Sequence, residues 1–356
     1  MALGVLIALA LITASAVAVV ITQNSYDLRE ERVALRHAGA TLDGVLALPR
    51  TGDGPYGLVV FVHGDGPVDA THETFYRPIW ESFARAGYAS LSFSKPGVAG
   101  SEGNWLDQSM EDRADETLAA VAWARARPDI DGGRIGLWGA SQAGWVMPKA
   151  AARDTRLQFV IAVAPAVDWQ RQGRYNLLAE LRRDGASEAE RAAALNRRET
   201  TLRLLRGGAS FDAYRDAIGA ETVGADEGAD DGGADGMTAD RWRFIAKNYT
   251  ANATADLRAM RGTPVLLVLG GHDINVDVAD TEKAYRALLP HGTLQVRHIP
   301  DATHSLVKHD VEDSEVRLTL TALFAPRALF ADGALADQRR FLERLDAGTG
   351  RATGSS

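Results

Sequence analysis

One serine stands in a setting typical of a catalytic nucleophile. Ser141 follows the apolar segment 135–138 and is bracketed by glycines in the sequence Gly139-Ala-Ser-Gln-Ala-Gly144. Small neighbours allow a serine to occupy a sharp turn between a strand and a helix, which exposes its Oγ above the end of a sheet. Ala143 stands where the G-x-S-x-G pattern has its second glycine, and this departure weakens the motif. The segment predicts a nucleophile elbow.

A serine nucleophile needs a histidine base, and the chain has 8 histidines. His304 lies just past the apolar segment that ends at Ile299, where a loop can carry it over Ser141. His309 is the weaker candidate. The other histidines lie in an early ribbon, before a loop, at a helix start, beside the best acid, or before or within a strand: His37, His63, His72, His272, His291 and His298.

The acid that orients the base is expected to be Asp273, which follows the apolar segment 264–269. Asp277, Asp280 and Asp301 are the alternatives. The resulting chain order of serine, aspartate and histidine differs from the orders in chymotrypsin and in subtilisin.

An oxyanion hole is predicted from a second glycine-rich turn. The apolar segment 59–62 runs into His63-Gly-Asp-Gly-Pro67. In a hydrolase, the backbone amides of Asp65 and of Gln142, the residue after the nucleophile, would bind the oxyanion. The alternative is an ordinary loop between a strand and a helix. His63 is expected to brace this loop rather than to take part in the chemistry.

Strands and helices alternate along the chain, which is typical of βαβ units and a parallel sheet. A ribbon is expected over Arg32 to Leu48, with Gly39 and Gly44 in turns. The further expected strands are 57–62, 89–93, 134–138, 157–164, 264–269 and 293–299, and the expected helices are 72–86, 108–127, one from 141, and 336–345.

The alternation stops at residues 168–261, which are rich in Ala, Arg, Glu and Leu. We interpret them as a helical cap inserted into a core formed by residues 32–167 and 262–346. Within the cap, residues 224–236 are acidic and poor in apolar residues, so this loop is expected to be disordered, as is the tail 347–356. The loop lacks the frame of a calcium-binding loop.

The first residues of the chain suggest a membrane segment. Residues 2–22 contain no charged side chain, and a helix over them would be about 30 Å long, close to the hydrocarbon thickness of a bilayer. The prediction is an uncleaved anchor over residues 1–22, with a cleaved signal peptide as the alternative. The arginines between positions 29 and 36 favour a cytoplasmic body, whereas the signal-like composition slightly favours an exported, extracytoplasmic one.

Composition excludes several classes of protein. With 39 Lys and Arg against 47 Asp and Glu, the net charge is -8, so nucleic acid is not an expected partner. The chain has no cysteine, which excludes a disulfide scaffold, a thiolate nucleophile and metal sites built on cysteine.

These motifs resemble those of the α/β-hydrolase superfamily, and within it the dienelactone-hydrolase-like and acyl-esterase group. His63-Gly-Asp-Gly-Pro67 is similar to the group's H-G-x-G-P, and the segment from Gly139 to Trp145 is similar to G-H-S-Q-G-G-W. The loop from Ser94 to Ser101 departs from the group's pattern at Pro96 and Ala99. The resemblance implies an α/β-hydrolase fold, with a mostly parallel, doubly wound sheet and an inserted helical cap.

The expected function is a serine hydrolase that cleaves carboxylic esters through an acyl-enzyme, with Ser141, Asp273 and His304 as the triad. A serine aminopeptidase or acyl-peptide hydrolase is the alternative in the same fold. A catalytically inactive binding module is the alternative from another class. The mechanism needs no cofactor, and the expected partner is a small ester or acyl substrate; the acyl chain, the leaving group and the oligomeric state stay open.

Overall fold

The computed structural model describes residues 2–222 and 237–348. Within these residues, the strands form one 8-stranded sheet in the order β1-β2-β4-β3-β5-β6-β7-β8. The strands are β1 (Leu28–His37), β2 (Ala40–Pro49), β3 (Tyr56–Val62), β4 (Tyr88–Phe93), β5 (Ile130–Ala140), β6 (Val160–Val163), β7 (Val265–Gly270) and β8 (Leu294–Ile299). β1 and β2 pair antiparallel, as do β2 and β4, and all other neighbours are parallel. The predicted mostly parallel sheet is confirmed.

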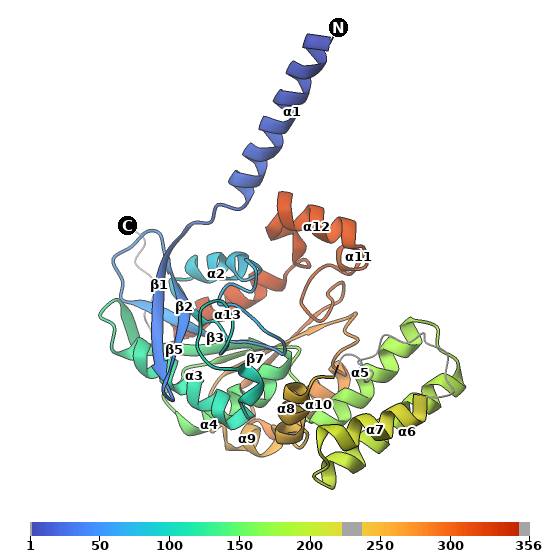
Figure 1. Ribbon diagram of the computed structural model, residues 1–356. Coiled ribbons are helices and arrows are strands. Elements are labelled where there is room, and N and C mark those ends of the chain that lie inside the picture. The colour runs from blue at the N-terminus through green and yellow to red at the C-terminus, as the bar shows by residue number, and fades with distance from the viewer. Residues whose placement is uncertain (1, 223–236, 349–356) are drawn as a thin grey trace.

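Helices connect the strands and cover both faces of the sheet (Figure 1). The helices of the core are α2 (Arg77–Ala84), α3 (Met110–Arg125), α4 (Met147–Arg153), α10 (Val278–Leu288), α11 (His309–Glu312), α12 (Glu315–Phe324) and α13 (Ala334–Gly348), with 3-10 turns η1 (Trp105–Asp107), η2 (Ser141–Trp145) and η3 (Pro326–Leu329). The predicted α/β-hydrolase architecture, doubly wound with an insertion after β6, is present.

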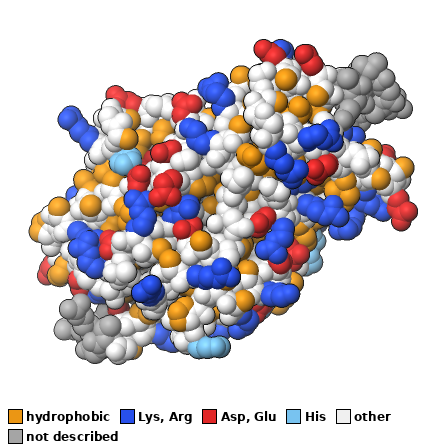
Figure 2. All heavy atoms as spheres, turned by 90° about the horizontal axis from the view of Figure 1, so that it is seen from below, with side chains coloured by type: hydrophobic (Ala, Val, Ile, Leu, Met, Phe, Trp, Pro, Cys, Tyr) orange, Lys and Arg blue, Asp and Glu red, His pale blue; other side chains and the backbone are white. Residues whose placement is uncertain are grey.

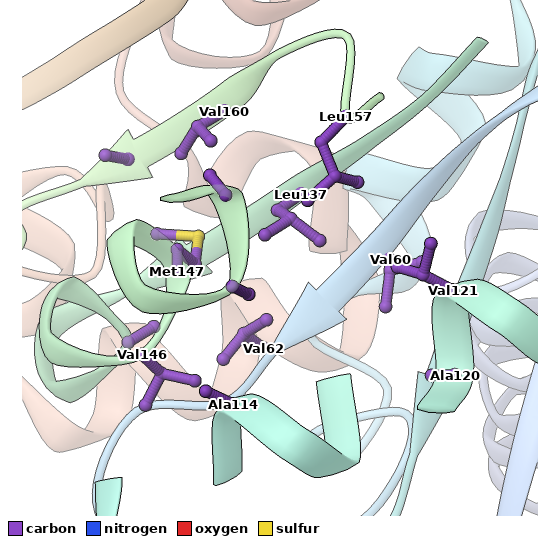
Figure 3. Packing of buried hydrophobic residues seen from close by; sticks show 14 of the residues in the cluster. Val60, Val62, Ala114, Ala120, Val121, Leu137, Val146, Met147, Leu157 and Val160 are labelled. Carbon is purple, nitrogen blue, oxygen red and sulfur yellow. The ribbon is translucent and has the colours of Figure 1, made fainter. Parts of the chain in front are cut away.

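The two faces of the sheet bury separate hydrophobic clusters. On one face, α3 and α4 pack on the central strands, and Figure 3 shows Val60 beside Val121 and Val62 beside Ala114. On the other face, α2 and α13 contribute Trp80 and Phe341 to a second cluster. Because strands β3, β6 and β7 are buried on both faces, their sequences are almost continuously apolar. This rigid sheet holds the loops that leave its carboxyl edge.

Between β6 and β7 the chain forms five helices in the described residues: α5 (Trp169–Arg183), α6 (Glu188–Arg206), α7 (Phe211–Thr222), α8 (Ala239–Asn248) and α9 (Thr254–Ala259). Figure 1 shows α5, α6 and α7 to one side of the sheet. Their helical content agrees with the expected insertion, but its role as a cap stays a prediction. The acidic loop predicted over 224–236 lies outside the described residues.

The disordered tail predicted over 347–356 is wrong at its start, because residues 347 and 348 still belong to α13. α13 extends to Gly348 because its last turn is held to the core: Asp346 is buried, pairs with Arg134 and accepts a hydrogen bond from Tyr88 at 2.8 Å. The rest of the expected tail lies outside the described residues.

Two local predictions are wrong. Gly44 lies inside β2 rather than in a turn, and a Cβ there would approach the ring of Phe93 to 2.4 Å, so the glycine permits close packing. The helix expected from His72 starts only at Arg77, because His72, Glu73 and Thr74 have positive φ angles of 48°, 52° and 78°. Gly39 does occupy the turn between β1 and β2, with φ at 82°.

The N-terminal segment forms α1 (Ala2–Gln23), which stands out from the body of the molecule (Figure 1). Among the described residues, no helix has the length and apolarity to cross a membrane. The predicted anchor or signal over residues 1–22 is therefore not supported, and the cellular location stays a prediction. On the face shown in Figure 2, acidic and basic side chains are intermingled.

Candidate active site

Ser141 occupies a strained turn at the carboxyl end of β5. Its φ is 56°, in the left-handed region that residues with a Cβ rarely adopt. β5 ends at Ala140 and η2 begins at Ser141, so the serine stands between a strand and a helix, as the elbow motif predicts. A strained backbone at one polar residue is typical of functional sites.

Two glycines make this turn possible. A Cβ on Gly139 would lie 2.7 Å from the carbonyl oxygen of Val62, and a Cβ on Gly144 would lie 2.4 Å from that of Ala166. Ala143, by contrast, fits into the core and is fully buried. The close approach that needs a glycine therefore occurs at Gly144, and the methyl group of Ala143 is accommodated in the core.

The predicted acid and base meet on the loops after β7 and β8. His304 Nδ1 lies 2.8 Å from Asp273 Oδ2, and the Asp273 side chain is fully buried while that of His304 is 17% exposed. Asp273 Oδ1 accepts hydrogen bonds from the backbone amides of Asn275 at 2.8 Å and Val276 at 2.9 Å. The carboxylate is thus fixed in position, and its contact with Nδ1 favours the tautomer that carries the proton there, with Nε2 free to act as the base.

The relation of this pair to Ser141 rests on topology. β5, β6 and β7 are parallel neighbours, and β8 follows β7, so the loops that carry Ser141, Asp273 and His304 all leave the same edge of the sheet. In the part of the chain that the structure describes, no hydrogen bond joins Ser141 Oγ to His304. Such bonds are often long before substrate binds.

The rival histidine and acids make other contacts. His309 begins α11 and stacks on His272, with the ring centroids 3.9 Å apart. Asp277 caps α10 through the amides of Ala279 and Asp280, and Asp301 is exposed. Within the residues that the structure describes, none of them forms a hydrogen bond or ion pair with His304, so His304 and Asp273 are the pair that the fold brings together.

The loop after β3 lies directly over the elbow. A Cβ on Gly64 would be 3.6 Å from Ser141 Cβ. The amide of Asp65, the predicted oxyanion donor, has no backbone partner among the described residues. Gln142 is the second residue of η2, a position whose amide has no partner within the helix. Both predicted donors therefore lie next to Ser141 with amides available to a ligand.

His63 supports this loop. Its Nε2–H donates to the carbonyl of Phe93 at 2.7 Å, and its Nδ1 accepts from the hydroxyl of Tyr76 at 3.1 Å. Burial, with a further contribution from Lys95, lowers the pKa of His63 to about 3, so the ring is neutral. The predicted bracing role of His63 agrees with these contacts.

Two buried cations lie beneath the loop, and the sequence analysis did not identify either. Lys95 follows β4 and is 2% exposed, and Arg113 in α3 is 5% exposed. Burial, and then the charge of Arg113, lowers the pKa of Lys95 well below its usual range. The sequence did contain a signal for Lys95: it lies two residues after a fully buried strand, at the edge of the sheet where the active-site loops meet.

The inserted helices contact both halves of the site. In α5, Tyr175 donates to the carbonyl of Asp273 at 2.9 Å and Gln172 to that of Asn275 at 2.9 Å. In α8, Arg241 forms a two-point ion pair with Asp65, one contact being 3.0 Å. Burial alone would raise the pKa of Asp65, but the contact with Arg241 lowers this pKa to about 2. The insertion is therefore bound to the acid loop and to the oxyanion loop.

A cavity of about 540 Å³ opens beside the acid and base, lined by His272, Asp273 and His304 together with residues of α5 and α11. Among the described residues, no cluster of three or more side chains could hold a metal ion.

Comparison with known proteins identifies the family. The family model for X-Pro dipeptidyl-peptidase (S15 family) matches residues 11–305, which is more than half of the chain. The chain belongs to the S15 family. It is a hydrolase of the α/β-hydrolase superfamily, as the motifs predicted.

Individual relatives are more distant. The chain is 33% identical over 114 residues to the quorum-quenching protein AidA of Acinetobacter baumannii, which is 31% of this chain and 36% of that protein. It is 31% identical over 131 residues to the thiohydrolase aneE of Aspergillus aculeatus, 36% of this chain and 39% of that protein. The chain thus spans less than half the length of these curated relatives.

A solved structure supports the fold. The α/β-hydrolase GrgF from Penicillium sp. sh18 superposes with a TM-score of 0.56 at 19% identity, over 90% of this chain and 100% of that one. At this identity the similarity shows the fold alone.

Proposed function

We propose that this S15-family hydrolase cleaves carboxylic esters through an acyl-enzyme formed on Ser141. The observation that carries the proposal is the pair formed by His304 Nδ1 and the buried Asp273 carboxylate, which leaves Nε2 as the proton acceptor. Ser141, in its strained turn at the same edge of the sheet, is the nucleophile that such a base would serve.

The reaction would follow the serine-hydrolase sequence. Ser141 Oγ attacks the acyl carbonyl and passes its proton to His304 Nε2, while Asp273 stabilises the resulting imidazolium. The tetrahedral oxyanion accepts hydrogen bonds from the amides of Asp65 and Gln142, each contributing about 3 kcal/mol to transition-state stabilisation. The imidazolium then protonates the leaving alcohol. Water attacks the acyl-enzyme by the same proton route in reverse.

Ester turnover by the purified protein tests the proposal. With p-nitrophenyl butyrate as substrate, Ser141→Ala, Asp273→Asn and His304→Ala are each expected to reduce kcat by about 10³-fold or more. His309→Ala and Asp301→Asn are the matched controls, because they replace the same residue types outside the pair. Full activity in Ser141→Ala would overturn the mechanism, whereas no ester turnover by the unmodified protein would favour an inactive binding module. If ester turnover is lost in His309→Ala but not in His304→Ala, the base must be reassigned. If it is lost in Asp301→Asn but not in Asp273→Asn, the acid must be reassigned.

Peptide hydrolysis is the second candidate, because the matching family model is that of X-Pro dipeptidyl-peptidases. The same triad can cleave esters, thioesters and amides, which differ in the leaving group. Ala-Pro-p-nitroanilide and a butyryl thioester, the latter included because one relative is a thiohydrolase, should be measured beside the p-nitrophenyl ester. A kcat/KM for the dipeptide anilide above that for both acyl substrates would favour the peptidase.

A further inference from the structure

Lys95 is hydrogen-bonded to the loop that carries the predicted oxyanion donor. Its Nζ donates to the carbonyl oxygen of Gly64 at 2.6 Å and to that of Gly66 at 2.8 Å. The aliphatic part of the side chain is buried, and the ammonium group lies 4.6 Å from the centre of the Trp105 ring. A buried lysine with two backbone acceptors is held in one position.

The first of these bonds fixes the orientation of one peptide group. The carbonyl of Gly64 and the amide of Asp65 belong to the same planar trans peptide, so they point in opposite directions. With the carbonyl held by Lys95 on one side, the Asp65 N–H points to the other side. The elbow closely borders this loop, since a Cβ on Gly64 would contact Ser141 Cβ at 3.6 Å.

Arg113 holds the neighbouring parts of the site. Its Nη2 donates to the carbonyl of His63 at 2.6 Å, and its Nη1 donates to the side-chain oxygen of Gln142. Gln142 in turn donates from Nε2 to the Asp65 carboxylate at 3.0 Å. One cation thus ties the start of the oxyanion loop to the residue that provides the second donor.

We propose that Lys95 is a positioning residue that orients the Gly64–Asp65 peptide so that its N–H faces the oxyanion, with Arg113 fixing the adjacent peptide and Gln142. The inference rests on the proposed function, because it assigns Lys95 a part in the same acyl transfer. Lys95 does not touch the substrate and acts through the backbone.

The placement also favours the transition state electrostatically. A hydrogen bond donated to the carbonyl of a peptide polarises the peptide and strengthens its N–H as a donor. Within a water-poor environment, such preorganised dipoles stabilise a charge that develops only in the transition state. Lys95 should therefore affect kcat more than substrate binding.

The test replaces Lys95 with methionine, which has a similar length and no charge. Lys149→Met is the matched control, because Lys149 binds Asp256 between α4 and α9, outside the oxyanion loop. We expect Lys95→Met to lower kcat for p-nitrophenyl butyrate by about 10- to 100-fold with KM changed less than about 3-fold. The control should stay within about 2-fold of the unmodified protein.

Two further measurements separate positioning from a general loss of structure. Rates are divided by the number of sites that a fluorophosphonate labels when the reaction is run to completion, so that unfolded molecules do not count. Inhibition by a butyl boronic acid, which forms a tetrahedral adduct, should weaken in Lys95→Met by about the same factor as kcat/KM falls. If Lys95→Met does not fold, Lys95→Gln takes its place, because its shorter amide cannot reach both carbonyls.

A rate per labelled site and a boronate affinity within about 3-fold of the unmodified protein would overturn the positioning role. Failure of the proposed function would look different, because the unmodified protein would then neither hydrolyse the acyl substrates nor become labelled.

Discussion

The hydroxyl of Tyr175 in α5 donates to the backbone carbonyl of Asp273 at 2.9 Å, so the insertion after β6 directly supports the loop that holds the predicted acid. Gln172 and Asn176 of the same helix donate to the carbonyls of Asn275 and Ile274. Consecutive carbonyls of one loop are thus satisfied by side chains of one helix. The insertion therefore helps to position Asp273.

Tyr175→Phe should weaken this support while keeping the ring. We expect a loss of about 1 kcal/mol in the free energy of unfolding and a fall in ester kcat of about 3- to 10-fold, because Asp273 and His304 lose their fixed geometry. Chemical denaturation and steady-state kinetics measure the two effects. Tyr249→Phe is the control, because Tyr249 also belongs to the insertion and its hydroxyl has no hydrogen bond among the described residues. Equal behaviour of the two variants would contradict the supporting role.

His63 should make the stability of the fold depend on pH. Burial lowers its pKa to about 3 in the folded state, whereas histidine in an unfolded chain titrates near pH 6.5. Between these values the unfolded state binds more protons, so the free energy of unfolding falls as the pH is lowered. The contribution of His63 should decrease by about 2 kcal/mol between pH 7 and pH 5.

Urea unfolding at several pH values checks this expectation. His63→Gln, whose amide can still donate to Phe93, should be less stable at pH 7 but lose less stability on acidification than the unmodified protein. Parallel pH profiles of the two proteins would show that His63 is not the group responsible.

Gly144 is expected to tolerate no side chain. In Gly144→Ala, the new Cβ would meet the backbone of Ala166 at 2.4 Å, so the turn or the segment after β6 must shift. We expect a loss of about 1–3 kcal/mol in unfolding free energy and a marked loss of ester turnover. Gly132→Ala in β5, where the added Cβ would lie 3.6 Å from the Arg125 side chain, an ordinary contact distance, should be neutral or stabilising. The opposite ranking in thermal melts would contradict the observed packing.

Backbone strain at Ser141 can be measured without activity. Because its φ is 56°, glycine should fit better than alanine, so Ser141→Gly should be more stable than Ser141→Ala by about 1 kcal/mol. At Ala192, an exposed position within α6, Ala192→Gly should instead destabilise by about 1 kcal/mol. If Ser141→Gly is less stable than Ser141→Ala, the backbone of the elbow is not strained.

Much of the site was predictable because it follows strand ends. Ser141, Asp273 and His304 each come after an apolar segment, and the carboxyl ends of parallel strands share one edge of the sheet. The family resemblance then set the fold and the order of the residues. The roles of these residues stay predictions, but the contact between His304 and Asp273 is present.

Other features depend on tertiary contacts that no local pattern contains. Lys95 meets the carbonyl of Gly64 only after β3 and β4 pair, and Tyr175 meets Asp273 across 98 residues of sequence. Gly44 resembled a turn glycine because its packing partner, Phe93, lies on another strand. Ala143 weakened the motif in the sequence because the close approach at Gly144 could not be known from spacing.

The most direct test of the central claim is covalent labelling of the nucleophile. The purified protein is treated with a fluorophosphonate, digested, and the modified residue identified by mass spectrometry. We expect one label per chain, on Ser141, with labelling slowed by several orders of magnitude in His304→Ala and unchanged in His309→Ala. Absence of a label, or a label on a serine other than Ser141, would contradict the assignment of this protein as a serine hydrolase acting through Ser141.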